Sequence, residues 1–134
     1  MNKRILNSCL RTARKRNTEE SHPEYGSFMH FSFVVKDNKI IEYATNRGGV
    51  TLYSKFYDRV SKTHAEAAAY TKAKGLMRKG DEFEMVNIRL NKAGDLRNSA
   101  PCKGCNMLLT LFGCTKVWYS TKEGEFEKVS LDNV

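Results

Sequence analysis

The chain has 134 residues, of which 40% are hydrophobic and 28% are charged, and its formal net charge is +8. This length suits one domain with a single core, and the composition excludes a disordered chain. The apolar runs are too short to cross a bilayer as a helix. The excess of Lys and Arg favours an anionic partner, such as a nucleotide phosphate or a nucleic acid.

The N-terminus and the cysteines indicate a cytoplasmic protein. Residues 1–6 are basic, but no apolar stretch follows that is long enough for a secretory signal. We therefore expect an intracellular location, where thiols stay reduced. Cys9 falls on an apolar helical stripe and Cys114 precedes an apolar strand, so both are expected to be buried structural thiols. Cys102 and Cys105 follow a proline at a spacing that indicates metal or redox chemistry.

The first half of the chain predicts one helix and a hairpin. Residues 3–16 have helical periodicity, with an apolar stripe made of Ile5, Leu6, Cys9, Leu10 and Ala13. Residues 28–35 and 40–45 are rich in aromatic and β-branched residues, and the turn formers Asp37 and Asn38 separate them. These two segments therefore predict an antiparallel hairpin.

The second half predicts two helices and three strands. Thr63 is a suitable N-cap for a helix over 63–76, and Pro101 suits the first turn of a helix over about 101–112. The strands are expected over 83–90, 116–121 and 126–131. The alternation of strand and helix predicts parallel neighbours. The last connection is too short for a parallel crossover, so the final two strands should be antiparallel.

Four residues in this framework point to a catalytic zinc site. One imidazole and two thiols, from His64, Cys102 and Cys105, can fill three corners of a zinc tetrahedron and leave the fourth for water. Zinc lowers the pKa of such a water, and Glu66 stands where it could take the water's proton. His64 and the cysteines also lie at predicted helix starts, where the helix dipole favours thiolates.

Three other interpretations of these residues remain open. Residues 63–66 also form a capping box, in which Glu66 would bond back to the helix cap. Cys102 and Cys105 could be a redox pair, although that leaves the histidine unexplained. A closed structural zinc site would need a fourth ligand, for which Cys114 and His30 are candidates without motif spacing.

The His-Ala-Glu motif at 64–66 and the Pro-Cys-Lys-Gly-Cys motif at 101–105 resemble the cytidine deaminase superfamily over residues 27–131. The resemblance implies an α/β fold with three α-β-α layers and a five-stranded mixed sheet. It also implies zinc ligation by His64, Cys102 and Cys105, with Glu66 as the proton shuttle. The predicted C-terminal hairpin is similar to free cytidine deaminases and several bacterial toxin deaminases. Free cytidine deaminases usually have Cys where His64 stands, which argues against a free nucleoside as substrate.

The resemblance and the sequence together suggest substrate-binding residues. Asn46 ends the second predicted strand, where the family uses an asparagine to bond the ribose or the base edge. Ser99 and Ala100 precede the proline motif, where the family lends backbone carbonyls to the exocyclic amine. Ala65, between His64 and Glu66, belongs to the same expected set.

An aromatic and basic loop before the zinc helix completes the expected site. Tyr53 and Tyr57 stand close to Lys55 and Arg59, so this loop could stack a base and hold its phosphate, or pack against the first helix. The cations of residues 11–16 are a second candidate for phosphate contact; equally, they could form a solvated face.

We therefore predict a single zinc-dependent deaminase domain over 1–134, with one Zn²⁺, that converts cytosine to uracil. The positive charge, the basic first helix and the aromatic loop favour cytosine in single-stranded nucleic acid as substrate. A free (deoxy)cytidine nucleotide is the alternative enzyme substrate. The non-enzyme alternative is a basic nucleic-acid-binding module whose zinc only holds the fold.

Overall fold

The computed structural model describes residues 1–19, 28–48 and 62–131. The helices are α1 (Lys3–Glu19), α2 (Ala65–Ala73), the short 3-10 turn η2 (Lys74–Leu76) and α3 (Lys103–Leu111). The strands are β1 (Phe28–Lys36), β2 (Lys39–Thr45), β3 (Arg47–Gly48), β4 (Lys62–Thr63), β5 (Phe83–Asn91), β6 (Leu96–Arg97), β7 (Cys114–Ser120) and β8 (Phe126–Ser130). Within these ranges, no helix has both the length and the apolar character needed to cross a membrane.

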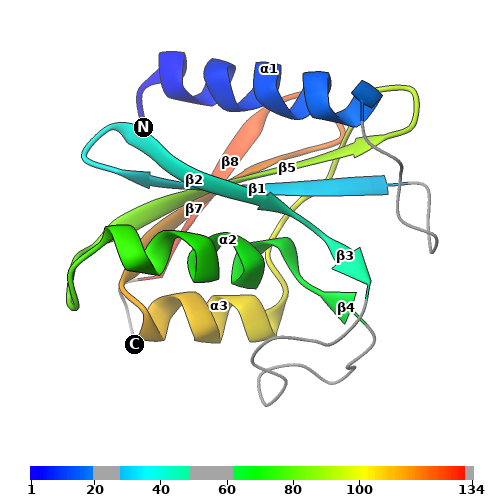
Figure 1. The fold of residues 1–134 in the computed structure, drawn as a ribbon. Helices are drawn as coiled ribbons and strands as arrows, with labels where there is room; N and C mark the ends of the chain where they lie inside the picture. The colour runs from blue at the N-terminus through cyan, green and yellow to red at the C-terminus, as the bar shows by residue number, and fades with distance from the viewer. Residues whose placement is uncertain (20–27, 49–61, 132–134) are drawn as a thin grey trace.

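These elements form three layers around one mixed sheet. The strand order is β2-β1-β5-β7-β8, with the short β6 paired to β5, while β3 and β4 form a separate two-stranded sheet. Helix α1 covers one face of the large sheet, and α2 and α3 lie side by side on the other face (Figure 1). The predicted α-β-α architecture is therefore confirmed.

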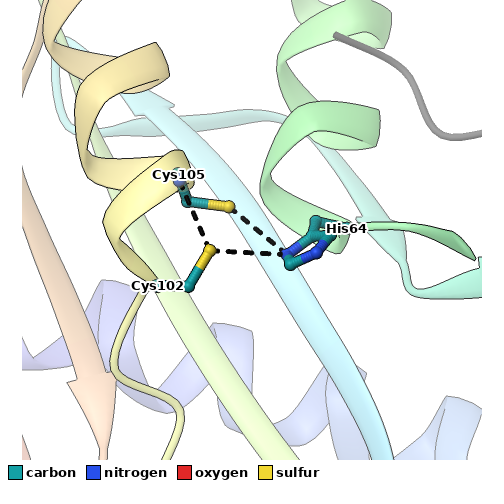
Figure 2. Close-up of side chains that lie close together, drawn as sticks. All are labelled: His64, Cys102 and Cys105. Atoms are coloured by element: carbon teal, nitrogen blue, oxygen red, sulfur yellow. Dashed lines mark hydrogen bonds between the residues drawn. The ribbon is translucent and has the colours of Figure 1, made fainter. Parts of the chain in front are cut away.

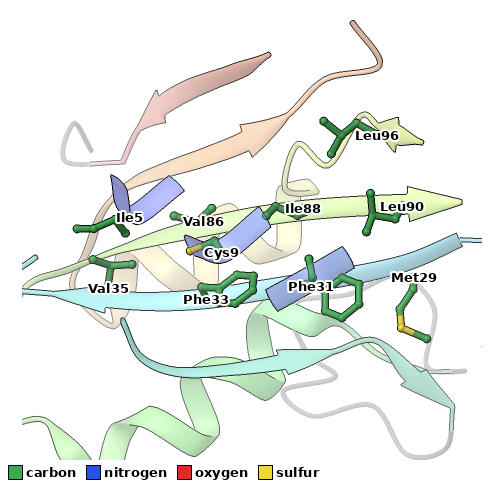
Figure 3. Close-up of a cluster of buried hydrophobic side chains, with 11 residues drawn as sticks. Ile5, Cys9, Met29, Phe31, Phe33, Val35, Val86, Ile88, Leu90 and Leu96 are labelled. Carbon is green, nitrogen blue, oxygen red and sulfur yellow. The ribbon is translucent and has the colours of Figure 1, made fainter. Parts of the chain in front are cut away.

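The core beneath α1 is built by a stripe that continues past the predicted end of the helix. Ile5, Cys9 and Ala13 pack against the apolar side chains of β1 and β5 (Figure 3). The next position on the stripe, Asn17, is also buried, and its Nδ2 donates to the carbonyl of Asn91 at 3.0 Å. The helix was expected to end at residue 16 because residue 17 is polar; this tertiary hydrogen bond accommodates it instead.

The predicted hairpin forms between β1 and β2. Asp37 and Asn38 are its two loop residues, with φ of 52° and 61°. Positive φ at both positions is the type I′ turn, whose twist matches that of the flanking strands, and Asn and Asp tolerate this conformation better than most residues. The Asp37-Asn38 pair therefore fixes the turn that joins β1 to β2.

The prediction of parallel neighbours is right for one pair of strands and wrong for the other. β5 and β7 are parallel neighbours joined through α3, and β7 pairs antiparallel with β8, as expected. β2 and β5 are not neighbours, because β1 lies between them and pairs antiparallel with both. β1, the hairpin partner of β2, thus lies where β5 would lie if the connection through α2 had joined neighbouring parallel strands.

Both helices that carry the predicted ligands begin later than expected. The N-cap of α2 is His64 rather than Thr63, and the His64 side chain makes no capping hydrogen bond. The N-cap of α3 is Cys102 rather than a residue before Pro101, because its sulfur accepts a hydrogen bond from the backbone of Cys105. Side-chain geometry, which the sequence pattern does not contain, decides both starts.

One half of the sheet face beneath α2 is polar. Along β1 and β5, the cross-strand pairs on this face are Val34 with Met85, Ser32 with Asn87, and His30 with Arg89. The first pair is buried apolar core packed beneath the alanines of α2, whereas the other two are polar. Because side chains alternate between the two faces of a strand, this polar end is built by residues two apart.

We expect Gly113→Ala to lower the free energy of unfolding by about 1–3 kcal/mol or more. Gly113 follows α3 with φ of +97°, and a Cβ there would lie 2.7 Å from the carbonyl oxygen of Asp81. Urea denaturation measures the change. Gly75→Ala is the matched control, because a Cβ at that position meets no atom within 4 Å; equal stabilities of the two variants would contradict the expected strain.

Candidate metal centre

The starts of α2 and α3 bring three potential metal ligands together. His64 is the N-cap of α2, Cys102 is the N-cap of α3, and Cys105 lies in the first turn of α3. His64 Nδ1 is 3.7 Å from Cys102 Sγ and 3.6 Å from Cys105 Sγ (Figure 2). All three ligand atoms lie within 4.8 Å of one another. The two helix ends thus hold one imidazole and two sulfurs on rigid elements.

These distances match those around a tetrahedral zinc ion. With Zn–S near 2.3 Å and Zn–N near 2.0–2.1 Å, a tetrahedral angle separates the sulfur and nitrogen atoms by about 3.6 Å. The two sulfur-to-Nδ1 distances, 3.7 and 3.6 Å, agree with this value. Both sulfur-to-nitrogen distances are therefore compatible with a shared zinc ion.

The local structure also favours the thiolate form that a metal needs. Cys102 Sγ accepts a hydrogen bond from the backbone N–H of Cys105 at 3.4 Å. Hydrogen bonding with Cys105 lowers the pKa of the Cys102 thiol to about 4; burial opposes this shift, and His64 reinforces it. Cys102 is therefore a thiolate at neutral pH, the form that ligates metals and replaces an ordinary oxygen cap at this helix end.

The two other cysteines are buried thiols, as predicted. Burial raises the pKa of Cys9 and of Cys114 to about 12, and none of the four cysteines forms a disulfide. Over the described parts of the chain, neither Cys114 nor His30 joins the group of potential ligands. The candidates for a fourth protein ligand therefore do not close the site, and three ligands with an open position are the arrangement of catalytic zinc centres.

Glu66 lies in the first turn of α2 and is fixed from the sheet. Its residue exposure is only 2%, and Asn87 Nδ2 donates to its Oε2 at 3.1 Å. Asn87 is held in turn, because its Oδ1 accepts from Ser32 Oγ at 2.8 Å. A buried carboxylate without enough partners is costly, so this placement indicates a use for the charge beyond packing.

Asn46 is engaged through one end of its side-chain amide. Its side-chain Oδ1 accepts a hydrogen bond from the backbone N–H of His30 at 2.9 Å. The backbone N–H of Asn46 donates to the carbonyl of His30 at 3.1 Å. The amide therefore extends the pairing of β1 with β2 by one residue. Its Nδ2 is left as the end that could donate to a substrate.

The other expected substrate residues differ in their availability. Ser99 is buried, its carbonyl accepts from Asn87 Nδ2 at 3.2 Å, and its hydroxyl contacts Ser120 Oγ at 2.9 Å. Ala100 is exposed, and Ala65 is buried in the first turn of α2. Tyr53 and Tyr57 lie outside the described residues, as do Lys55 and Arg59. Of Ser99 and Ala100, Ala100 is therefore the more exposed.

The sequence interpretation missed Asn87 and Ser32. Both are fully buried polar residues within strands, and together they orient Glu66. One signal was present: Asn87 interrupts the apolar run of residues 83–90, on the same strand face as Phe83 and Met85. A buried polar residue in a strand needs a partner, but the sequence does not say which one.

Comparison with known proteins gives a fold. No protein-family model and no curated protein matches this chain. Solved structures do match: a cytidine deaminase from Burkholderia pseudomallei has a TM-score of 0.66 at 18% identity, over 98% of this chain and 94% of that one. The chain has the fold of the cytidine deaminases.

Two further structures with the cytidine deaminase fold show the breadth of the likeness. A cytidine deaminase from Mycobacterium leprae has a TM-score of 0.60 at 13% identity, covering 94% of this chain and 92% of that chain. A dCMP deaminase from the cyanophage S-TIM5 has a TM-score of 0.59 at 21% identity, covering 90% and 86%. At these identities the comparison establishes the cytidine deaminase fold, and the site must be argued from its own geometry.

Proposed function

We propose that the protein is a zinc-dependent hydrolytic deaminase that converts cytosine to uracil. The observation that carries this proposal is one imidazole and two sulfurs whose ligand atoms lie within 4.8 Å of one another, together with a buried carboxylate two residues along the chain from the imidazole. The cytidine deaminase fold supports it, because three solved structures of that fold are named as cytidine or dCMP deaminases.

Each residue of the centre has a part in this chemistry. His64, Cys102 and Cys105 would hold the metal, and bound zinc would supply a water of lowered pKa. Glu66 takes a proton from the attacking water, whose oxygen adds to C4 of the base. Glu66 delivers this proton to N3. It then moves the remaining proton from the hydroxyl on C4 to the amine, which leaves as the C4–N bond breaks, so that water and cytosine yield uracil and ammonia. Asn87 keeps one carboxylate oxygen fixed throughout.

A panel assay tests the proposal directly. Zinc-loaded protein is incubated with cytosine- and adenine-containing oligonucleotides and free nucleotides, and ammonia release and a mass gain of about one unit are measured. Deamination of a cytosine substrate supports the proposal. Stoichiometric zinc without ammonia from any substrate would instead favour a nucleic-acid-binding module with structural zinc.

Two substrate forms follow from the positive charge. Cytosine in single-stranded nucleic acid is the form that the basic first helix suggested. Helix α1 lies on the sheet face opposite α2 and α3, so its cations would contribute only to a polynucleotide that passed around the sheet edge. A free cytidine nucleotide needs few cations, and a dCMP deaminase of this fold was solved with dCMP and dUMP. The position of α1 therefore favours a free cytidine nucleotide as the substrate.

Salt dependence should separate the two forms. We expect the KM for dCMP to change little between about 50 and 200 mM salt. Over the same range, the binding of a protein that contacts many phosphates weakens steeply. Oligonucleotide affinity that falls with a logarithmic slope of about −0.7 per neutralised phosphate would show a polynucleotide site instead. Replacing Arg11 and Arg14 together by Gln is the matched test of α1, whose exposed side carries both; we expect no effect on dCMP turnover.

The two metal-binding thiols also bear on location. Cys102 and Cys105 lie close together and form no disulfide, so an oxidising compartment could remove both ligands by joining them. We therefore propose that the protein acts in the reducing cytoplasm.

A further inference from the structure

His30 lies next to Glu66 on the polar end of the sheet. It belongs to β1, faces α2 with Ser32, and pairs across the strands with Arg89. Both backbone groups of His30 bond to Asn46, at 2.9 and 3.1 Å. The main chain at this position is therefore fixed by a residue of the expected substrate site.

The imidazole of His30 has an unusual environment. Its Nε2 is buried and has no hydrogen-bond partner among the described residues. Burial lowers the pKa of His30; the nearby Glu66 and Asn87 offset that shift only in part, and Arg89 and His64 add to it. A buried ring nitrogen without a partner costs free energy, so such a group needs an explanation other than packing.

The two oxygens of Glu66 differ in a way that supplies this explanation. Asn87 holds Oε2 at 3.1 Å, whereas Oε1 lies 3.9 Å from His30 Nε2. A direct N–H···O hydrogen bond needs about 2.7–3.2 Å, so closing the contact takes a shift of about 1 Å. Catalytic hydrogen bonds are commonly long without substrate and shorten when it binds.

We propose that His30 is a positioning residue for Glu66, whose Nε2–H donates to Oε1 when substrate occupies the site. Asn87 and His30 then hold one carboxylate oxygen each. A carboxylate oxygen has two lone pairs, so Oε1 keeps one free for the proton of the attacking water. This inference rests on the proposed deamination and names a residue that the zinc and Glu66 motifs do not include.

Kinetics of two His30 variants test this role. His30→Leu removes the donor at similar size. We expect kcat to fall about 10- to 100-fold, the range typical when a hydrogen-bond partner of a metal-ligating residue is removed. KM and zinc content should stay near wild type. His30→Gln restores an N–H donor and should recover most of the loss. Equal kcat for His30→Leu and wild type, or no recovery in His30→Gln, would overturn the proposal.

A spectroscopic test needs no turnover and does not depend on the folding of the His30 variants. The sequence has three histidines, so ¹⁵N spectra of labelled imidazoles can be assigned. Because Oε1 already lies 3.9 Å from Nε2 without substrate, we expect the Nε2 resonance of His30 to shift between wild type and Glu66→Gln, in both metal-loaded and metal-free protein. An unchanged resonance would overturn the contact. If wild type released no ammonia, the proposed function would fail, while this measurement would still decide whether His30 contacts Glu66.

Discussion

Glu66→Gln should leave the zinc content at one ion per chain and reduce turnover by at least about 10²- to 10⁴-fold, the contribution typical of general acid–base groups. The change keeps the size of the side chain and an oxygen that can accept from Asn87 Nδ2, which is 3.1 Å from Oε2 in the wild type. What it removes is the carboxylate to which we assign the proton transfers. The effect should therefore fall on kcat rather than on folding or metal binding.

Three measurements on this variant decide the role of Glu66. Metal analysis gives zinc per chain, thermal unfolding reports folding, and ammonia release gives kcat. Glu84→Gln is the matched control, because Glu84 is a partly buried carboxylate on β5 that accepts from Trp118 Nε1 at 3.0 Å, and glutamine can keep that bond. Wild-type turnover in Glu66→Gln would rule out the proton shuttle, whereas loss of zinc would move Glu66 to the metal-binding group.

Cys105→Ala should lose both zinc and turnover. Cys105 has no exposed surface, and its sulfur lies 3.6 Å from His64 Nδ1. Without this thiolate, one imidazole and one sulfur remain, too few to hold zinc tightly in a three-ligand site. Because metal binding stabilises the folded state that contains the site, a chelator should lower the melting temperature of wild type but not of this variant.

The matched control for this change is Cys9→Ala. Cys9 is equally buried, but it lies in the core beneath α1, and burial raises its pKa to about 12. This variant should lose some stability through the cavity it creates, yet keep its zinc and the chelator effect. Stoichiometric zinc in Cys105→Ala would contradict the ligand assignment, and zinc loss in Cys9→Ala would show that metal analysis reports unfolding instead.

Local patterns in the sequence were sufficient for most of the elements. The stripe at residues 5, 9 and 13 predicted the first helix, and the pair Asp37 and Asn38 predicted the hairpin turn. These predictions succeeded because each depends on residues within about one helical turn or one β-turn. The helix starts at His64 and Cys102 were misplaced because a cap is defined by a hydrogen bond that a side chain either makes or does not make.

Some residues of the candidate site could likewise be named from the sequence, whereas others needed the tertiary structure. His64, Glu66, Cys102 and Cys105 could be named from their types and spacing, because the chemistry of zinc restricts its ligands to few residue types. His30 and Asn87 could not be linked to Glu66, since that depends on strand order and register, where a slip of one residue turns every side chain to the other face.

The sequence by itself thus determined which groups can bind the metal and carry the proton, and which segments are helices and strands. The tertiary structure alone decided that α1 lies across the sheet from the metal centre, and that β1 lies between β2 and β5. It also placed His30 of β1 beside Oε1 of Glu66. The physical reason is that chemistry and local conformation are properties of neighbouring residues, whereas packing and register result from contacts between segments distant in the chain.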